Sequence, residues 1–158
     1  YIDQAVEKGR GVIHLTAHFG NWELSSFAAS LKGYHIKVFA REQKHPRLNQ
    51  LLNQYRELSG CRVIQKGMAL RELIRGLRHN EIMGMLGDQN AGASGMQINF
   101  FNRLASTPAG AIALALKTKA ALLPSFIIRE RNIYHRIIVQ KPLELEDTGN
   151  TNLDIKNR

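Results

Sequence analysis

Short apolar segments that alternate with helix-length segments constrain the fold of this chain more than any other feature. The apolar segments are partly β-branched, which favours buried strands over helices. The segments between them repeat apolar residues every three or four positions, as helices that cover a sheet do. The expected strands are 11–17, 36–40, 62–64 and 82–86, and the expected helices run from the N-cap Asn21 to Gly33, over 46–58 and over 68–79. This alternation predicts an α/β fold with a mostly parallel central sheet and helices on both faces.

The second half of the chain predicts an antiparallel end to the sheet. Residues 90–95 are expected to form a loop and residues 96–101 an extended segment. Thr107 and Pro108 combine a capping residue with a proline at the first helical position, so we expect a helix over 109–119. Two strands, 122–129 and 134–140, would then form a closing hairpin. A chain of 158 residues with 44% hydrophobic residues can bury the core of one domain, which we expect to span 1–158.

The turn after the first expected strand holds an imidazole and a carboxylate five positions apart, in the sequence His18-Phe19-Gly20-Asn21-Trp22-Glu23. Asn21 is a good N-cap for the following helix and Glu23 lies on its first turn. A carboxylate beside one ring nitrogen fixes the tautomer, so that the other nitrogen can take a proton from a hydroxyl. The motif therefore predicts a general base. Taken alone, the same residues also fit a surface histidine beside a helix cap.

Three polar residues from distant parts of the sequence follow expected strands directly. They are His18, Arg41 and Asp88. Ligands of open α/β sheets bind outside the carboxyl ends of the strands, and these side chains would meet there. The sequence therefore predicts one site at that edge of the sheet.

The net charge of +9 and the isoelectric point near 10.1 predict an acidic partner. Nucleic acid, phospholipid headgroups, a phosphorylated glycolipid and an acidic carrier protein all satisfy this requirement. Only 7% of the residues are aromatic, which disfavours a nucleic-acid platform. Cys61 is the single cysteine, so we expect no disulfide framework, no thiolate zinc site and a reducing compartment.

Two other arrangements of reactive residues are less consistent with the pattern. His14 and His18 are spaced as a metal pair only on a helix, and the surrounding segment is predicted to be a strand, so no metal site is expected. Ser25 and Ser26 lack the Gly-x-Ser-x-Gly turn of a hydrolase nucleophile. We interpret His14 as an ordinary buried or turn-bonded histidine and both serines as ordinary helix residues.

A set of motifs follows in a fixed order along the chain. The set consists of His18 to Glu23, Arg41, Arg56, Gly60, Gly87 to Gly92, the aromatic pair Phe100-Phe101 and Ala105 to Gly110. In this order of motifs the chain resembles the late acyltransferases of lipid A biosynthesis, the lauroyl and myristoyl transferases within the lysophospholipid acyltransferase superfamily. The resemblance covers about residues 5–142 and departs from the family pattern at His45, Asn90, Asn102 and Lys119.

The resemblance implies a glycerol-3-phosphate-acyltransferase-like fold and a role for each motif residue. His18 would be the general base, and Glu23 would orient it and balance its charge. Arg41 would meet a phosphate or the charge that develops on a thioester oxygen. Asn21, Asp88 and Gln89 would complete the substrate-binding set, and no metal is implied.

The resemblance also implies the substrates and the location. The acyl donor would be the phosphopantetheine-linked thioester of acyl carrier protein, with no bound cofactor. The acceptor would be a hydroxyl of a lipid A precursor, a phosphorylated glycolipid of lipopolysaccharide biosynthesis. We expect contact with an anionic membrane surface, at the cytoplasmic face of a bacterial inner membrane, and no nucleic-acid partner. The chain would be a core fragment without an N-terminal membrane helix and a C-terminal region.

Two alternatives accompany this interpretation. One is acyl transfer to another glycolipid or to a lysophospholipid, with the same histidine and glutamate. The other is a basic domain without catalysis that binds nucleic acid or an anionic membrane.

Overall fold

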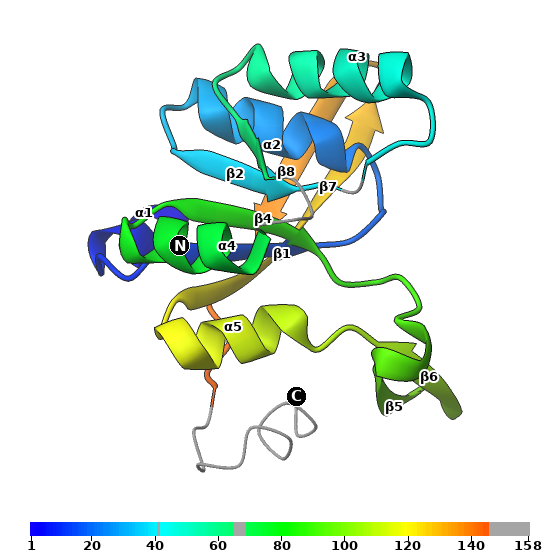
Figure 1. The fold of residues 1–158 in the computed structure, drawn as a ribbon. Helices are drawn as coiled ribbons and strands as arrows, with labels where there is room; N and C mark the ends of the chain where they lie inside the picture. The colour runs from blue at the N-terminus through cyan, green and yellow to red at the C-terminus, as the bar shows by residue number, and fades with distance from the viewer. Residues whose placement is uncertain (41, 65–68, 146–158) are drawn as a thin grey trace.

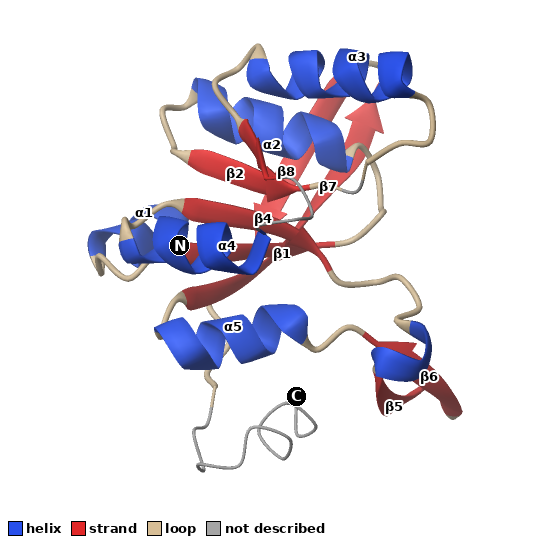
Figure 2. Cartoon of the chain, viewed as in Figure 1, coloured by secondary structure: helices blue, strands red, loops and turns tan. Residues whose placement is uncertain are grey.

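A six-stranded sheet with the order β3-β2-β4-β1-β7-β8 forms the centre of the molecule (Figures 1 and 2). The structure is a computed structural model, and it describes residues 1–40, 42–64 and 69–145. Five strands run parallel and β8 runs antiparallel to β7. The strands are β1 (Val12–Thr16), β2 (Ile36–Phe39), β3 (Arg62–Ile64), β4 (Ile82–Leu86), β7 (Ala121–Arg131) and β8 (Tyr134–Val139).

Helices cover both faces of this sheet and bury a separate apolar core on each. Alternate residues of one strand supply the two cores, since Val12 packs on one face and Ile13 on the other. The core that contains Ile13 also holds Leu77 and Leu114, from α4 and α5. The predicted α/β architecture with a closing hairpin is confirmed. The helices are α1 (Ile2–Glu7), α2 (Trp22–Leu31), α3 (Pro46–Glu57), α4 (Ala69–Arg78) and α5 (Gly110–Thr118).

A second, two-stranded sheet lies between β4 and α5 in the sequence and was not predicted. A short 3₁₀ helix, η2 (Gly92–Ser94), leads into β5 (Met96–Phe100), which pairs antiparallel with β6 (Arg103–Thr107). The helix predicted over 109–119 is confirmed as α5, but the predicted cap at Thr107 is wrong, because Thr107 pairs with Met96 at the base of this hairpin. The helix begins instead at Gly110, with Ala109 as its N-cap. The hairpin projects from the body of the molecule (Figure 1).

Helix α1 was not predicted, and residue 68, the expected start of the fourth helix, lies outside the described residues. Among the residues that the structure describes, every helix is too short or too polar to cross a membrane.

His14 is a buried histidine on β1, as predicted, with 5% of its surface exposed. Its Nε2 is hydrogen-bonded to the hydroxyl of Ser125 on β7, which is fully buried. Burial lowers the pKa of His14 from the ordinary value of 6.5 to about 4, because an imidazolium there would lose its hydration. The histidine is therefore neutral in the folded protein at neutral pH.

This shift predicts acid destabilisation that depends on His14. Below pH 6.5 the unfolded chain binds a proton that the folded protein takes up only near pH 4, so stability falls over this interval. The expected contribution is about 3 kcal/mol. Urea unfolding at pH 7, 5.5 and 4 should show this loss in the wild-type protein and a smaller loss in His14→Gln, which keeps a hydrogen-bonding side chain. Parallel pH profiles of the two proteins would contradict the prediction.

Candidate active site

His18 and Asp88 meet because their strands are neighbours in register. β1 and β4 are parallel, with Thr16 opposite Leu86, and each of the two site residues lies two positions beyond that pair. The Nδ1 atom of His18 is 2.8 Å from Oδ1 of Asp88. The backbone N–H of His18 donates to Oδ2 of the same carboxylate at 2.9 Å. One carboxylate therefore holds both the ring and the main chain of His18.

The turn that carries His18 requires a glycine. Gly20 has φ of +62°, and a Cβ atom there would collide with the carbonyl oxygen of Ile127 on β7. Asn21 then begins α2, and its side-chain oxygen accepts a hydrogen bond from the N–H of Leu24 at 3.2 Å. The close approach to β7 and the helix cap together fix the path of the loop.

The electrostatics favour an ionised Asp88. Partial burial raises its pKa, but hydrogen bonds from the His18 ring and backbone and the charge of His18 outweigh burial, so the net shift is downward. An ionised carboxylate accepts the proton on Nδ1, which leaves Nε2 as the basic atom of the ring. The side-chain amide of Gln89 lies 3.4 Å from this Nε2. The Trp22 ring packs edge-on against the imidazole, with 4.9 Å between centroids.

Glu23 is not the carboxylate on His18. Its two oxygens form a bidentate ion pair with Arg56 of α3, with Nε to Oε2 at 3.0 Å and Nη2 to Oε1 at 2.5 Å. This pair raises the pKa of Arg56. The expectation that Glu23 orients the imidazole is corrected by this geometry. Helix α2 directs Glu23 toward α3, and Asp88, just after β4, supplies the carboxylate instead.

A cavity of about 580 Å³ adjoins His18. Polar groups of the site reach it from several elements, and His18, Glu23, Arg56 and Gln89 are among its lining residues. Apolar side chains of β2 and β4, among them Val38 and Leu86, form part of its wall. A substrate in this cavity can therefore meet the histidine and an apolar surface together.

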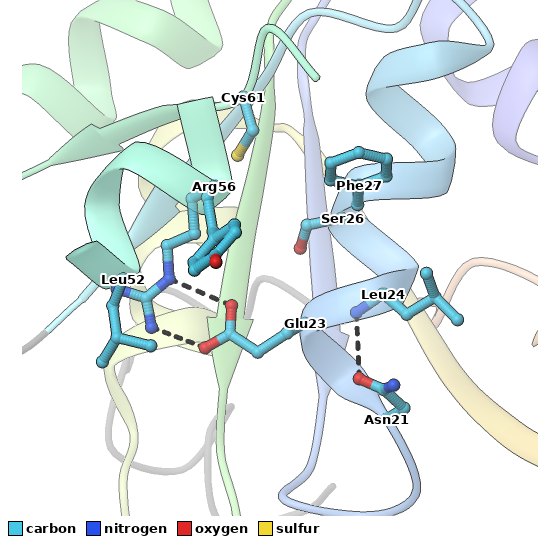
Figure 3. A pocket seen from close by; sticks show the side chains of 9 residues that line it. Asn21, Glu23, Leu24, Ser26, Phe27, Leu52, Arg56 and Cys61 are labelled. Carbon is cyan, nitrogen blue, oxygen red and sulfur yellow. Dashed lines mark hydrogen bonds and ion pairs between the residues drawn. The ribbon is translucent and has the colours of Figure 1, made fainter. Parts of the chain in front are cut away.

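A second cavity, of about 250 Å³, lies between α2 and α3 (Figure 3). It shares Glu23, Ser26, Leu52 and Arg56 with the first cavity, so the two are adjacent. Phe27 and the buried Cys61 are among the residues that line only this second cavity. Burial raises the pKa of the Cys61 thiol to about 11, so this end of the cavity holds a neutral thiol.

The structure brings together four of the six predicted site residues. His18, Asp88 and Gln89 are in contact, and Glu23 lines the same cavity. Asn21 caps α2 and lines the apolar cavity. Arg41 lies outside the described residues.

Glu23 was predicted to be the carboxylate partner of His18 because it is the acidic residue nearest to His18 along the chain. The signal for Asp88 was present, because both residues follow expected strands, but strand order within the sheet was needed to make them neighbours. The partnership of Arg56 with Glu23 had no local signal. Their positions are 33 residues apart, and only the packing of α3 beside α2 joins them.

The site thus consists of a histidine–carboxylate pair at the carboxyl edge of an α/β sheet, beside the His18 cavity and the apolar cavity. This is the edge where α/β proteins of this class bind their ligands. The chain belongs to the bacterial lipid A biosynthesis acyltransferase family, whose model matches residues 1–157. The predicted family resemblance is thereby confirmed.

The chain is also similar to three mycobacterial enzymes. Phosphatidylinositol mannoside acyltransferases of two Mycobacterium tuberculosis strains, CDC 1551 and H37Rv, are each 27% identical over 129 residues, 79% of this chain. The enzyme of the same name from Mycolicibacterium smegmatis is 28% identical over 124 residues, 76% of this chain. In each comparison the match spans 41% of the relative's length.

The Glu23–Arg56 ion pair should be measurable as a coupling between α2 and α3. The pair is bidentate, and the Arg56 side chain is 16% exposed while that of Glu23 is 44% exposed. We expect a coupling free energy of about 1 kcal/mol, at the upper end for exposed pairs, since water screens the Glu23 side. A double-mutant cycle with Glu23→Gln and Arg56→Gln, read by urea unfolding, measures it. Strict additivity of the two substitutions would contradict a stabilising pair.

Proposed function

We propose that this protein transfers a fatty acyl group from a thioester to a hydroxyl of a phosphorylated glycolipid, with His18 as general base. The observation that carries the proposal is the bond between Nδ1 of His18 and Asp88, because it leaves Nε2 as the basic atom beside a substrate-sized cavity. Membership in the lipid A biosynthesis acyltransferase family gives the reaction class.

In the proposed step, Nε2 of His18 accepts the hydroxyl proton as the hydroxyl oxygen bonds to the thioester carbonyl carbon. The C–S bond then breaks, and the leaving sulfur takes the proton from Nε2. The products are an ester and a thiol, so the reaction needs no oxidant or reductant. Asp88 stabilises the transient imidazolium. Gln89, at 3.4 Å from Nε2, would exchange that contact for the substrate and donate an N–H to the carbonyl oxygen.

The apolar cavity between α2 and α3 would hold the acyl chain. It adjoins the His18 cavity, and Phe27 and the neutral thiol of Cys61 are among its lining residues. The Glu23–Arg56 pair, drawn in Figure 3, lines both cavities. A carboxylate and a guanidinium that satisfy each other can flank an apolar chain at lower cost than either charge alone.

For the donor we propose the phosphopantetheine thioester of acyl carrier protein, whose acidic surface suits a chain of charge +9. For the acceptor we propose a lipid A precursor at the cytoplasmic face of a bacterial inner membrane. The relatives named for phosphatidylinositol mannoside make another glycolipid the second candidate. Both acceptors can be offered to the full-length protein, and mass spectrometry of the products separates them.

Loss of either member of the proposed pair should abolish most turnover. With the full-length protein, acyl carrier protein donor and both acceptors, His18→Ala and Asp88→Asn are expected to lower kcat by about 10²- to 10⁴-fold. Glu23→Gln should cost less, because Glu23 contacts Arg56 and not the imidazole. Matched controls are His79→Ala and Glu7→Gln, which change exposed residues away from the cavity.

The outcomes of this comparison are distinct. A greater loss in Glu23→Gln than in Asp88→Asn would make Glu23 the partner of the base. Unaltered turnover in His18→Ala would overturn the assignment of His18 as the base. Absence of turnover in the wild-type protein with either acceptor would favour a basic domain without catalysis, whose anion binding should survive His18→Ala and fall steeply with salt.

If the acyl chain occupies the apolar cavity, a narrower cavity should change the length of the acyl chain that the enzyme prefers. Ser26 is on the wall common to both cavities, so Ser26→Phe should narrow the entrance to the apolar one and shift the preferred donor toward shorter chains. Leu31→Phe adds a similar ring at the exposed end of the same helix and should leave the preference unchanged. Competition among acyl donors of several lengths measures the preference. An equal shift in both variants, or none in Ser26→Phe, would remove the acyl chain from this cavity.

A further inference from the structure

The tip of the β5–β6 hairpin exposes three large apolar side chains. Phe100 is 60% exposed, Phe101 86% and Leu104 76%. Phe100 and Phe101 contact each other edge to face, with 4.7 Å between centroids. An exposed apolar cluster of this kind marks a contact surface more often than a structural need.

The backbone of the turn makes the phenylalanine at its apex costly. Phe101 and Asn102 connect the strands, with φ of +50° and +61°. Such two-residue turns favour asparagine and glycine at both positions, and a bulky side chain is a rare choice for the left-handed region. Asn102 follows this preference and Phe101 does not. Because the Phe101 ring remains exposed, packing within the chain does not explain its presence.

The apolar groups surround the tip and do not form one flat face. Phe100 is opposite Arg103, and Asn99 is opposite Leu104, so Phe100 and Leu104 point to opposite faces of the hairpin. Phe101 occupies the end between them. A protein that docked on one face of the hairpin would contact only one side of this cluster. An apolar medium that surrounds the tip would cover all three side chains.

The position of the hairpin relates it to the active site. It follows β4 and Asp88, and it projects on the side of the sheet where β1 and β4 end (Figure 1). Arg103 is exposed beside the apolar cluster, and the chain carries a net charge of +9. A cation beside apolar side chains suits the boundary between acyl chains and anionic headgroups, where arginine reaches the phosphates.

We propose that the tip of this hairpin inserts into the interfacial layer of an anionic lipid bilayer, with Phe100, Phe101 and Leu104 among the upper acyl chains and Arg103 at the phosphates. Insertion here would turn the carboxyl edge of the sheet, and thus His18, toward the membrane surface. The role of this insertion in acyl transfer rests on the proposed function, in which the acceptor is a lipid. Its test requires no acyl transfer, so failure of insertion and failure of catalysis are separately observable.

Fluorescence quenching by lipid tests the insertion. Trp22 is the single tryptophan of these 158 residues, so a full-length protein with Trp22→Phe, and with any tryptophan outside these residues also replaced by Phe, accepts a reporter at Phe101→Trp. We expect vesicles of equimolar phosphatidylcholine and phosphatidylglycerol, brominated close to the headgroup, to quench this reporter. A matched reporter, Leu58→Trp, replaces another exposed leucine, which is 72% exposed at the end of α3, and should not be quenched.

Binding strength gives a second measurement in the same vesicles. Phe101→Ala combined with Leu104→Ser should weaken partitioning of the hairpin by at least about 10-fold, as expected for the loss of two buried apolar side chains. Leu58→Ser should leave partitioning unchanged. No quenching of the residue 101 reporter in bound protein, or equal quenching of both reporters, would overturn the proposal. A third outcome would also overturn it. If the protein self-associates with rising concentration in the absence of vesicles, and the hairpin variant does not, the tip binds a second copy of the chain.

Discussion

The parallel pairing of β1 with β4 is the interaction on which the site depends. It places Thr16 opposite Leu86, and each strand then continues for two residues to His18 and Asp88. A shift of one residue in this register would move the carboxylate away from Nδ1 and would also exchange the two faces of β4. Ile82 and Met83 contribute to opposite cores, so the apolar packing of both faces resists such a shift. The geometry of the base is therefore fixed by core packing well away from the histidine.

The backbone of His18 adds a second constraint. Asp88 accepts hydrogen bonds from both the ring and the main-chain N–H of His18, so the ring cannot move without the loop. Gly20 fixes the same loop from the other side by its contact with Ile127. A base held in this manner is preorganised, and less free energy is lost in orienting it at the moment of reaction.

Much of the fold could be predicted from the sequence because its elements have local causes. The end of β1, the Asn21 cap and the start of α3 at Pro46 all follow from apolar period, capping chemistry and proline geometry. The β5–β6 hairpin could not, because its turn uses Phe101 and Asn102 where the usual signal is asparagine followed by glycine. The prediction of the carboxylate partner of His18 was wrong for a different reason. Proximity in sequence suggested Glu23, whereas strand order, a property of the whole sheet, selected Asp88.

Asp88 and Glu23 bind different partners, His18 and Arg56, and this affects the chemistry of the imidazole. An imidazole beside two uncompensated carboxylates is stabilised in its protonated form, which cannot accept a proton from a hydroxyl. In this chain Arg56 neutralises Glu23 through two hydrogen bonds, so Asp88 alone acts on the ring. The arginine also lines both the His18 cavity and the apolar cavity. One residue of α3 thus sets the charge beside the base and shapes the path to the apolar cavity, so substitution of Arg56 is expected to affect both properties together.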